Sequence, residues 1–273
     1  MELWEYTNYL TEIPFMFNTY IREYDISKAN INILFRKKAI SEEQYHTLYQ
    51  SPKDIRQYTV GMMQRNNEKI KEILENGFKE CRKMFLEYNQ LSNVDILSIK
   101  KDAIYVINKK PKYTEFDNIV FLNKNTYTSY MSLAKRRIEL YYIRDRINNL
   151  EKVDVKGISD EKLKYHDNYF LDFIYYFFDI IQNENIESLI SSFQTFYKNY
   201  VERQLEIGYY RPFNEVSSFV LDWKDDLNPT KKYMIDSLNM ANKYRENIDI
   251  SYNANLLREM YQYLSYIYFS NHK

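Results

Sequence analysis

Two aspartates, Asp25 and Asp102, stand at the ends of segments that the sequence predicts to be β-strands. Asp102 lies in the polar centre of residues 93–108 (NVDILSIKKDAIYVIN), where apolar runs on both sides predict a hairpin. Asp25 lies near the end of an alternating segment, residues 19–26 (TYIREYDI), and a helical pattern begins directly after it. Carboxylates at the rim of a sheet can bind a divalent metal such as Mg²⁺, and we expect that role for both. The alternative for Asp102 is an ordinary turn residue, because aspartate is common in turns.

Cations that could bind a triphosphate follow on a predicted helix. Lys53 and Arg56 are about one helical turn apart, between the two aspartates in the chain. Nucleotidyl transfer with two metals needs carboxylates close together on a rigid sheet, and cations nearby to neutralise the phosphates. The order of these residues fits that requirement.

Further basic residues could hold the phosphates of a nucleic acid. Lys100 and Lys101 precede the second aspartate, and Lys135, Arg136 and Arg137 form a run in the strand-rich segment after the hairpin. Basic clusters interleaved with aromatic residues can bind a phosphate backbone and stack bases, so we expect the second run to contact a primer strand. The alternative is that each cluster is a solvated face.

The elements that must position these residues follow one another in a clear order. Helical periodicity covers residues 27–38, and cap signals at Ser41 and Ser51 begin helices that extend to about residue 90. Gly77 is the expected break within this helical run. The later elements are strands at residues 119–122 and 138–143, and helices at residues 160–182, 185–206, 230–246 and 253–269.

This order predicts an α+β fold with a boundary near residues 150–158. Residues 1–155 would hold the sheet together with the helices of residues 28–90, and residues 156–273 would be helical.

The composition limits the classes of protein that fit. The chain has 273 residues, 45% of them hydrophobic, and its 38 basic residues equal its 38 acidic ones, which argues mildly against a general nucleic-acid binder. Its single cysteine, Cys81, excludes an intrachain disulfide and fits a reducing cytosol. The sequence has no signal-peptide pattern and no apolar run long enough to cross a membrane. We therefore expect a cytoplasmic protein, in a bacterial host cell if a phage encodes it, that makes no membrane contact.

At these motifs the chain resembles the palm and fingers of template-dependent DNA polymerases, and it is most similar to the B family. That family's third motif, Tyr-Gly-Asp-Thr-Asp-Ser, aligns without a gap on residues 98–103 (SIKKDA), with Asp102 on the second Asp. Lys100 replaces the first Asp, and Ala103 replaces the Ser. The first motif, an Asp at a strand end before a Ser-Leu-Tyr-Pro-like helix start, would begin at Asp25.

The second motif of that family, Lys-x-x-x-Asn-Ser-x-Tyr-Gly, would fall on residues 53–61, where Lys53 and Gly61 match and the middle does not. The tyrosine with which the family screens the sugar 2′-hydroxyl would be Asn30 here. The resemblance therefore implies weaker discrimination against ribonucleotides.

The resemblance also implies an architecture and a site. The fold would be an antiparallel palm-like sheet with a helical fingers insertion and a helical thumb-like C-terminal third. Asp25 and Asp102 would be catalytic and hold Mg²⁺, while Lys53, Arg56 and Asn30 would bind the nucleotide. The partners would be a primer–template nucleic acid, nucleoside triphosphates and accessory replication proteins. Proofreading is not expected, since too few residues precede Asp25 for an exonuclease domain.

A second interpretation stays open. The chain could be a catalytically inactive descendant of a polymerase, or an unrelated phage protein, that binds a host protein as a regulator or anti-defence factor. The replacements at Lys100 and Ala103 fit a site that has decayed. Balanced charge and 29 tyrosines suit contacts with proteins. A helical regulator without polymerase ancestry is a third possibility.

Overall fold

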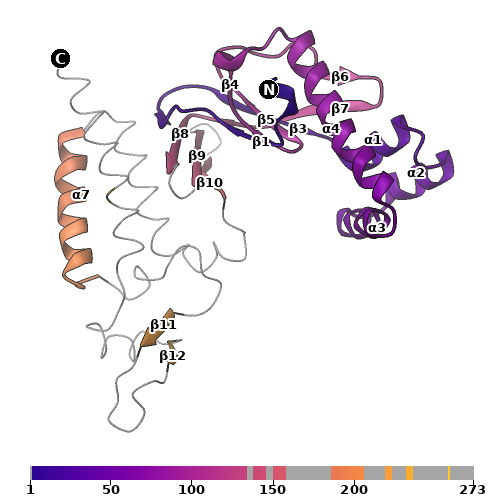
Figure 1. Ribbon diagram of the computed structural model, residues 1–273. Helices are drawn as coiled ribbons and strands as arrows, with labels where there is room; N and C mark the ends of the chain where they lie inside the picture. The colour runs from indigo at the N-terminus through magenta and orange to yellow at the C-terminus, as the bar shows by residue number, and fades with distance from the viewer. Residues whose placement is uncertain are drawn as a thin grey trace. The chain divides into compact units, whose positions relative to one another are not determined.

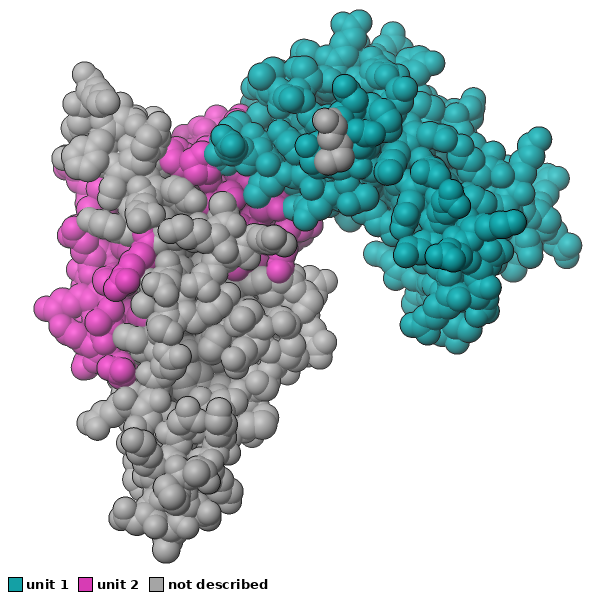
Figure 2. All heavy atoms as spheres, viewed as in Figure 1, with its two compact units in different colours: residues 1–13, 20–127 teal, residues 14–19, 128–273 magenta. Residues whose placement is uncertain are grey.

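The computed structural model describes residues 2–133, 138–145, 150–157, 186–205, 219–222, 232–235 and 258. The chain divides into two compact units, which Figure 2 distinguishes by colour. Unit 1 comprises residues 1–13 and 20–127, and unit 2 comprises residues 14–19 and 128–273.

Unit 1 is built on a six-stranded sheet whose neighbouring strands are all antiparallel (Figure 1). Strands from distant parts of the sequence alternate in it, so that β3 lies in the interior between β5 and β7. Its strands, in spatial order, are β1 (Asn8–Leu10), β4 (Ile96–Lys100), β5 (Ala103–Val106), β3 (Ile21–Ile26), β7 (Ile119–Tyr127) and β6 (Glu115–Phe116).

Four α-helices follow β3 in the chain before the hairpin begins (Figure 1). Two short 3₁₀ turns, η1 (Leu3–Glu5) and η2 (Asn93–Asp95), precede β1 and β4. The helices are α1 (Ala29–Arg36), α2 (Glu42–Gln50), α3 (Lys53–Asn66) and α4 (Glu68–Tyr88).

The core of unit 1 lies between the sheet and these helices. Tyr24 and Ile26 of β3 pack into it with Leu34 of α1 and Phe85 of α4. The ring of Phe85 stacks on Phe121 of β7 at a centroid distance of 4.4 Å. Successive side chains of a strand point to opposite faces, so the carboxylates of β3 lie on the face of the sheet that is turned away from this core.

The expected hairpin and the expected helix start at Ser41 are confirmed. A helix also begins after Ser51, but its N-cap is Pro52 and Ser51 is the C-cap of α2. One expected break is wrong. Residues 96–106 form the hairpin β4–β5, and Ser41 caps α2 with its side chain accepting a hydrogen bond from the Gln44 N–H. The helical run is interrupted at Asn67, which caps α4, and Gly77 lies inside that helix. A Cβ at Gly77 would lie 2.1 Å from Cγ2 of Ile33, so this glycine permits the close approach of α1 and α4.

The described residues of unit 2 form a four-stranded antiparallel sheet, a two-stranded one and a helix. The larger sheet has the order β10 (Leu150–Lys156), β9 (Ile138–Asp145), β8 (Ser129–Leu133) and β2 (Phe15–Met16). The smaller pairs β11 (Phe219–Asp222) with β12 (Lys232–Ile235), and the helix is α7 (Ile186–Val201).

The predicted helix at residues 185–206 is confirmed by α7. The predicted helix at residues 230–246 is wrong over residues 232–235, which pair with β11 as a strand. The helices expected at residues 160–182 and 253–269 lie outside the described residues, apart from Arg258.

The α+β class and the antiparallel sheets are thus confirmed. The comparison with palm, fingers and thumb, and the boundary near residue 155, stay predictions.

Candidate functional site

The two predicted metal ligands are brought together by the pairing of β3 with β5. In this antiparallel register Asp25 lies opposite Ala103, the residue after Asp102. The N–H of Ile26 donates a hydrogen bond of 3.1 Å to the backbone carbonyl oxygen of Asp102. Asp102 itself lies in the two-residue turn that joins β4 to β5. The end of an interior strand and the tip of a hairpin therefore meet at one rim of the sheet.

Burial and neighbouring charges both act on the pKa of the Asp25 carboxyl group. Burial raises the pKa of the Asp25 carboxyl above its ordinary value, and the negative charges of Asp102 and Glu23 raise it further. The ammonium of Lys124 lowers the pKa but does not cancel the rise. The Asp25 side chain keeps 29% of its surface exposed, so a ligand from solvent can reach it.

Lys124, on β7, is a site residue that the sequence analysis did not single out. Its Nζ lies 3.4 Å from Oδ2 of Asp25, as an ion pair. Partial burial lowers the pKa of Lys124, but the charges of Asp25 and Glu23 outweigh that effect and leave the pKa raised. No spacing in the sequence indicates this contact, because it depends on how β7 is registered against β3.

Glu23 is a second residue that the sequence analysis missed. Its carboxylate is 2% exposed and accepts hydrogen bonds from the hydroxyls of Tyr105 at 2.9 Å and Tyr127 at 2.7 Å. The side-chain amide of Asn125 donates to it as well, at 2.6 Å. The available signal was the alternation of β3, which puts Glu23 on the same face as Asp25. These hydrogen bonds join β3 to its neighbours β5 and β7 on the face of the sheet that carries the carboxylates.

The hairpin that carries Asp102 is also held at its base. Asp95, 2% exposed, accepts hydrogen bonds from the Ser92 N–H at 2.9 Å and the Lys109 ammonium at 3.0 Å. The N–H of Ile107 donates to the Asp95 carbonyl at 2.8 Å. The residues before β4 and after β5 are thereby tied to each other, which fixes the start and the end of the hairpin.

Both lysines that precede Asp102 contact other residues of this chain. Lys100 Nζ donates to Oδ1 of Asn8 at 3.0 Å, and Lys101 Nζ lies 4.9 Å from the ring centroid of Phe78 on α4. Contact of either lysine with a nucleic acid stays a prediction. The run Lys135–Arg137 lies outside the described residues.

The predicted nucleotide-binding residues lie on α1 and α3. Asn30 is in the first turn of α1, and its Oδ1 is buried with no hydrogen-bond partner within the described part of the chain. Lys53 begins α3, and Arg56 donates to the backbone carbonyl oxygen of Ser51. The charges that shift the pKa of Asp25 belong to Asp102, Lys124 and Glu23, and a shared site of Lys53 or Arg56 with Asp25 stays a prediction.

The metal-binding potential of the site rests on two carboxylates. Over the described ranges, no group of three or more His, Cys, Asp or Glu side chains is arranged to hold a metal ion. Mg²⁺ is commonly held by one or two carboxylates, with waters and substrate phosphates completing its shell. The pair Asp25 and Asp102 meets that lower requirement. In the same residues, no helix combines the length and apolar character needed to span a membrane.

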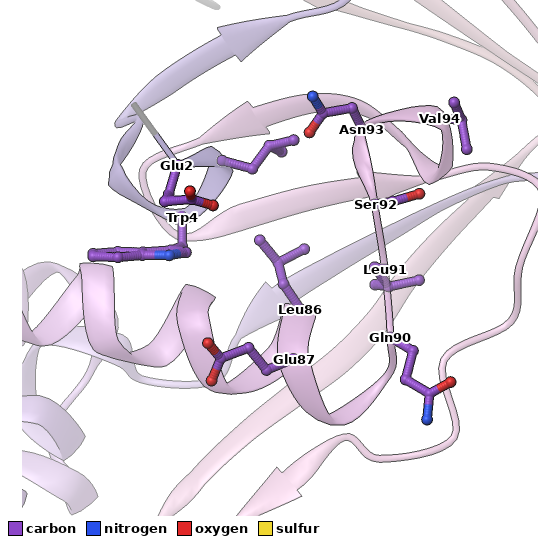
Figure 3. A pocket seen from close by; sticks show the side chains of 10 residues that line it. Glu2, Trp4, Leu86, Glu87, Gln90, Leu91, Ser92, Asn93 and Val94 are labelled. Carbon is purple, nitrogen blue, oxygen red and sulfur yellow. The ribbon is translucent and has the colours of Figure 1, made fainter.

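A separate shallow pocket of about 530 Å³ lies between the N-terminal turn η1 and the end of α4 (Figure 3). Apolar side chains, including Trp4, Leu86 and Leu91, line it together with the acidic Glu2 and Glu87. Neither aspartate of the candidate site belongs to its lining.

Comparison with known proteins gives one assignment. The model of a protein family described as Bacteriophage PBS1 gene 130 protein matches residues 1–266. A search of curated proteins found no match. The family description names a phage gene and no activity. Because the match spans nearly the whole chain, the protein belongs to this phage family, the Bacteriophage PBS1 gene 130 proteins.

Proposed function

We propose that this phage protein is a small template-dependent nucleotidyltransferase of the polymerase palm type, in which Asp25 and Asp102 hold Mg²⁺. The observation that carries the proposal is the β3–β5 register, with Asp25 opposite Ala103 and the Ile26 N–H bonded to the Asp102 carbonyl at 3.1 Å. Two carboxylates that are distant in the sequence thereby share one rim of a sheet, as two-metal chemistry requires.

The donor set and its support suit such a role. Mg²⁺ prefers oxygen ligands and, when bound here, would stabilise the charge on the phosphate oxygens as one phosphate bond forms and another breaks. The chain's own contribution is rigid placement of the ligands. Asp25 lies on an interior strand, and Arg82 of α4 donates a 2.7 Å hydrogen bond to the carbonyl of Lys101, next to Asp102.

Asn30 is the residue on α1 that we propose to contact the incoming nucleotide. Its buried Oδ1 lacks a partner among the described residues, and if the side chain turns outward a hydroxyl or amino group of a substrate could supply one. An asparagine is smaller than the tyrosine of the resembling polymerases, so a ribose 2′-hydroxyl would find room beside it.

The remaining predicted contacts lie on α3 and in the segment after the hairpin. Arg56 would have to release the Ser51 carbonyl before it could bind a triphosphate, whereas Lys53 is exposed at the start of α3. We propose the run Lys135–Arg137 as the contact to the primer strand of a primer–template. The enzyme would work in the cytoplasm of the phage's bacterial host.

Primer extension with Mg²⁺ tests the proposal. Wild type should extend a primer on a DNA or an RNA template, and Asp25→Asn and Asp102→Asn should each lower the rate on the order of 100-fold or more. Asp117→Asn is the matched control, because Asp117 is 83% exposed and pairs with Arg36 instead. Absence of extension on both templates, or equal rates in all variants, would overturn the proposal.

A second candidate function is binding of a host protein, for which the phage family and one surface provide support. Ile55 and Tyr58 are 50% and 70% exposed and lie about one turn apart on α3. Exposed apolar side chains on one helix face are typical of contact surfaces.

Affinity purification from infected host cells distinguishes this candidate. A host protein that wild type retains and Ile55→Asp loses, together with no primer extension, would favour the binding role. Retention of the same protein by both forms would exclude the α3 surface as its contact.

A further inference from the structure

Strand β7 carries one extra residue where it passes the carboxylates of β3. Asn123 pairs with Tyr24 and Asn125 pairs with Glu23, so Lys124 is the inserted residue of a β-bulge. A bulge breaks the simple alternation of side chains and can re-aim one of them, and bulges are frequent beside functional sites.

The bulge turns two consecutive donors toward the same strand. Lys124 Nζ lies 3.4 Å from Oδ2 of Asp25, and the amide of Asn125 lies 2.6 Å from Oε2 of Glu23. The charges of Glu23 and Asp102 also act on the Lys124 ammonium. The ammonium of Lys124 is therefore attracted by three carboxylates, those of Asp25, Asp102 and Glu23. A metal bound at the aspartate pair would be attracted by the same three.

We propose that Lys124 is the resident counter-ion of the Asp25–Asp102 pair, which a divalent cation must displace, so that Lys124 sets the metal affinity of the site. This inference rests on the proposed function, since it takes both aspartates as the metal ligands.

Three physical features support the exchange. Neighbouring carboxylates repel one another when both are ionised, and an ammonium beside them relieves that repulsion in the absence of metal. The same ammonium repels a divalent cation that approaches the pair. The Lys124 side chain is 56% exposed, and a lysine stem is flexible, so it can move into water without disturbing the sheet.

Binding of Mn²⁺ to the full-length chain measures this competition without any catalytic step. The electron paramagnetic resonance signal of free Mn²⁺ gives the dissociation constant for each variant. Because exposed ion pairs are weak, we expect Lys124→Met to tighten Mn²⁺ binding by roughly threefold to tenfold. Lys124→Arg keeps the charge and should stay within about twofold of wild type.

Two further variants complete the set. Lys83→Met removes a lysine that pairs with Glu87 at 3.8 Å instead, and it should leave Mn²⁺ affinity unchanged. Asp25→Asn should weaken Mn²⁺ binding strongly, because it removes a ligand. Thermal unfolding of each variant confirms that it is folded.

The outcomes separate this inference from the proposed function. If Asp25→Asn loses Mn²⁺ while Lys124→Met binds it no more tightly than wild type, the counter-ion role is overturned and the metal site stands. If wild type binds no Mn²⁺, or Asp25→Asn binds it as well as wild type, the metal site and the counter-ion role are both overturned.

Discussion

The guanidinium of Arg82, on α4, donates a hydrogen bond of 2.7 Å to the backbone carbonyl oxygen of Lys101, the residue before Asp102. Its Nε donates a second bond, of 2.9 Å, to the carbonyl of Trp4. Burial lowers the pKa of Arg82 to about 10, which still leaves it charged at neutral pH. A buried cation on a helix thus holds the tip of the hairpin that carries the proposed ligand.

Replacing Arg82 should therefore affect both stability and the site. Arg82→Met removes a buried donor and with it two partly buried hydrogen bonds, and we expect it to lower the free energy of unfolding by about 2–4 kcal/mol. It should also weaken Mn²⁺ binding, because Asp102 loses its support. Urea unfolding and Mn²⁺ titration measure the two effects, with Lys83→Met as a surface control expected to cost under about 1 kcal/mol. Lost stability with unchanged Mn²⁺ affinity would show that Arg82 does not position Asp102.

Two glycines in helices should respond to alanine in opposite directions. A Cβ at Gly77 would lie 2.1 Å from Cγ2 of Ile33, a β-branched side chain that cannot easily move, so Gly77→Ala should destabilise the protein by about 1–3 kcal/mol. At Gly61, inside α3, a Cβ would meet nothing within 4 Å, so Gly61→Ala should stabilise it by about 0.5–1 kcal/mol. Urea unfolding of both variants checks the prediction, and changes of the same sign would contradict it.

The stability supplied by Asp95 should disappear in acid. Burial raises the pKa of Asp95, but hydrogen bonds from Ser92 and Lys109 outweigh it and leave the pKa below its ordinary value. A carboxyl with a lowered pKa in the folded state contributes its stability above the unfolded pKa and loses it as pH falls through the folded pKa. Asp95→Asn should thus cost about 1–2 kcal/mol at pH 7 and less at pH 3. Urea unfolding across that range measures the difference, and a cost independent of pH would contradict this account.

Asn30 gives a prediction about substrate choice. If the protein extends primers, wild type should incorporate ribonucleotides and deoxyribonucleotides at comparable rates, because Asn30 presents little bulk to a 2′-hydroxyl. Asn30→Tyr should raise the preference for deoxyribonucleotides by roughly tenfold or more. Single-nucleotide incorporation measures both ratios. A wild type that strictly rejects ribonucleotides would rule out this role for Asn30.

Features of the fold that depend only on residues close together in the sequence could be predicted. Three such features depend on a few neighbouring residues, and the structure confirms them. They are the alternation before Asp25, the apolar runs around Asp102 and the Ser41 cap. The break between α3 and α4 was misplaced at Gly77, although Asn67 followed by Glu68 is itself a helix-start signal. Position 77 requires a glycine because α1 packs closely against α4 there, not because the helix ends.

The parts of the site that could not be predicted depend on contacts between distant segments. Lys124 reaches Asp25 only because of a bulge in β7, and Arg82 reaches the hairpin tip only because α4 packs behind it. Glu23 was visible as a neighbour of Asp25, but its burial under two tyrosine hydroxyls follows from the strand order. Periodicity shows which face a residue takes, not which residue of another strand it meets.

The position of Mn²⁺ in crystals of the full chain, located by its anomalous scattering, tests the central claim most directly. The account predicts a peak bound by carboxylate oxygens of both Asp25 and Asp102, at distances of about 2.0–2.2 Å, and no such peak in Asp102→Asn crystals. A peak that touches neither aspartate, or no peak in wild-type crystals at saturating Mn²⁺, would contradict it.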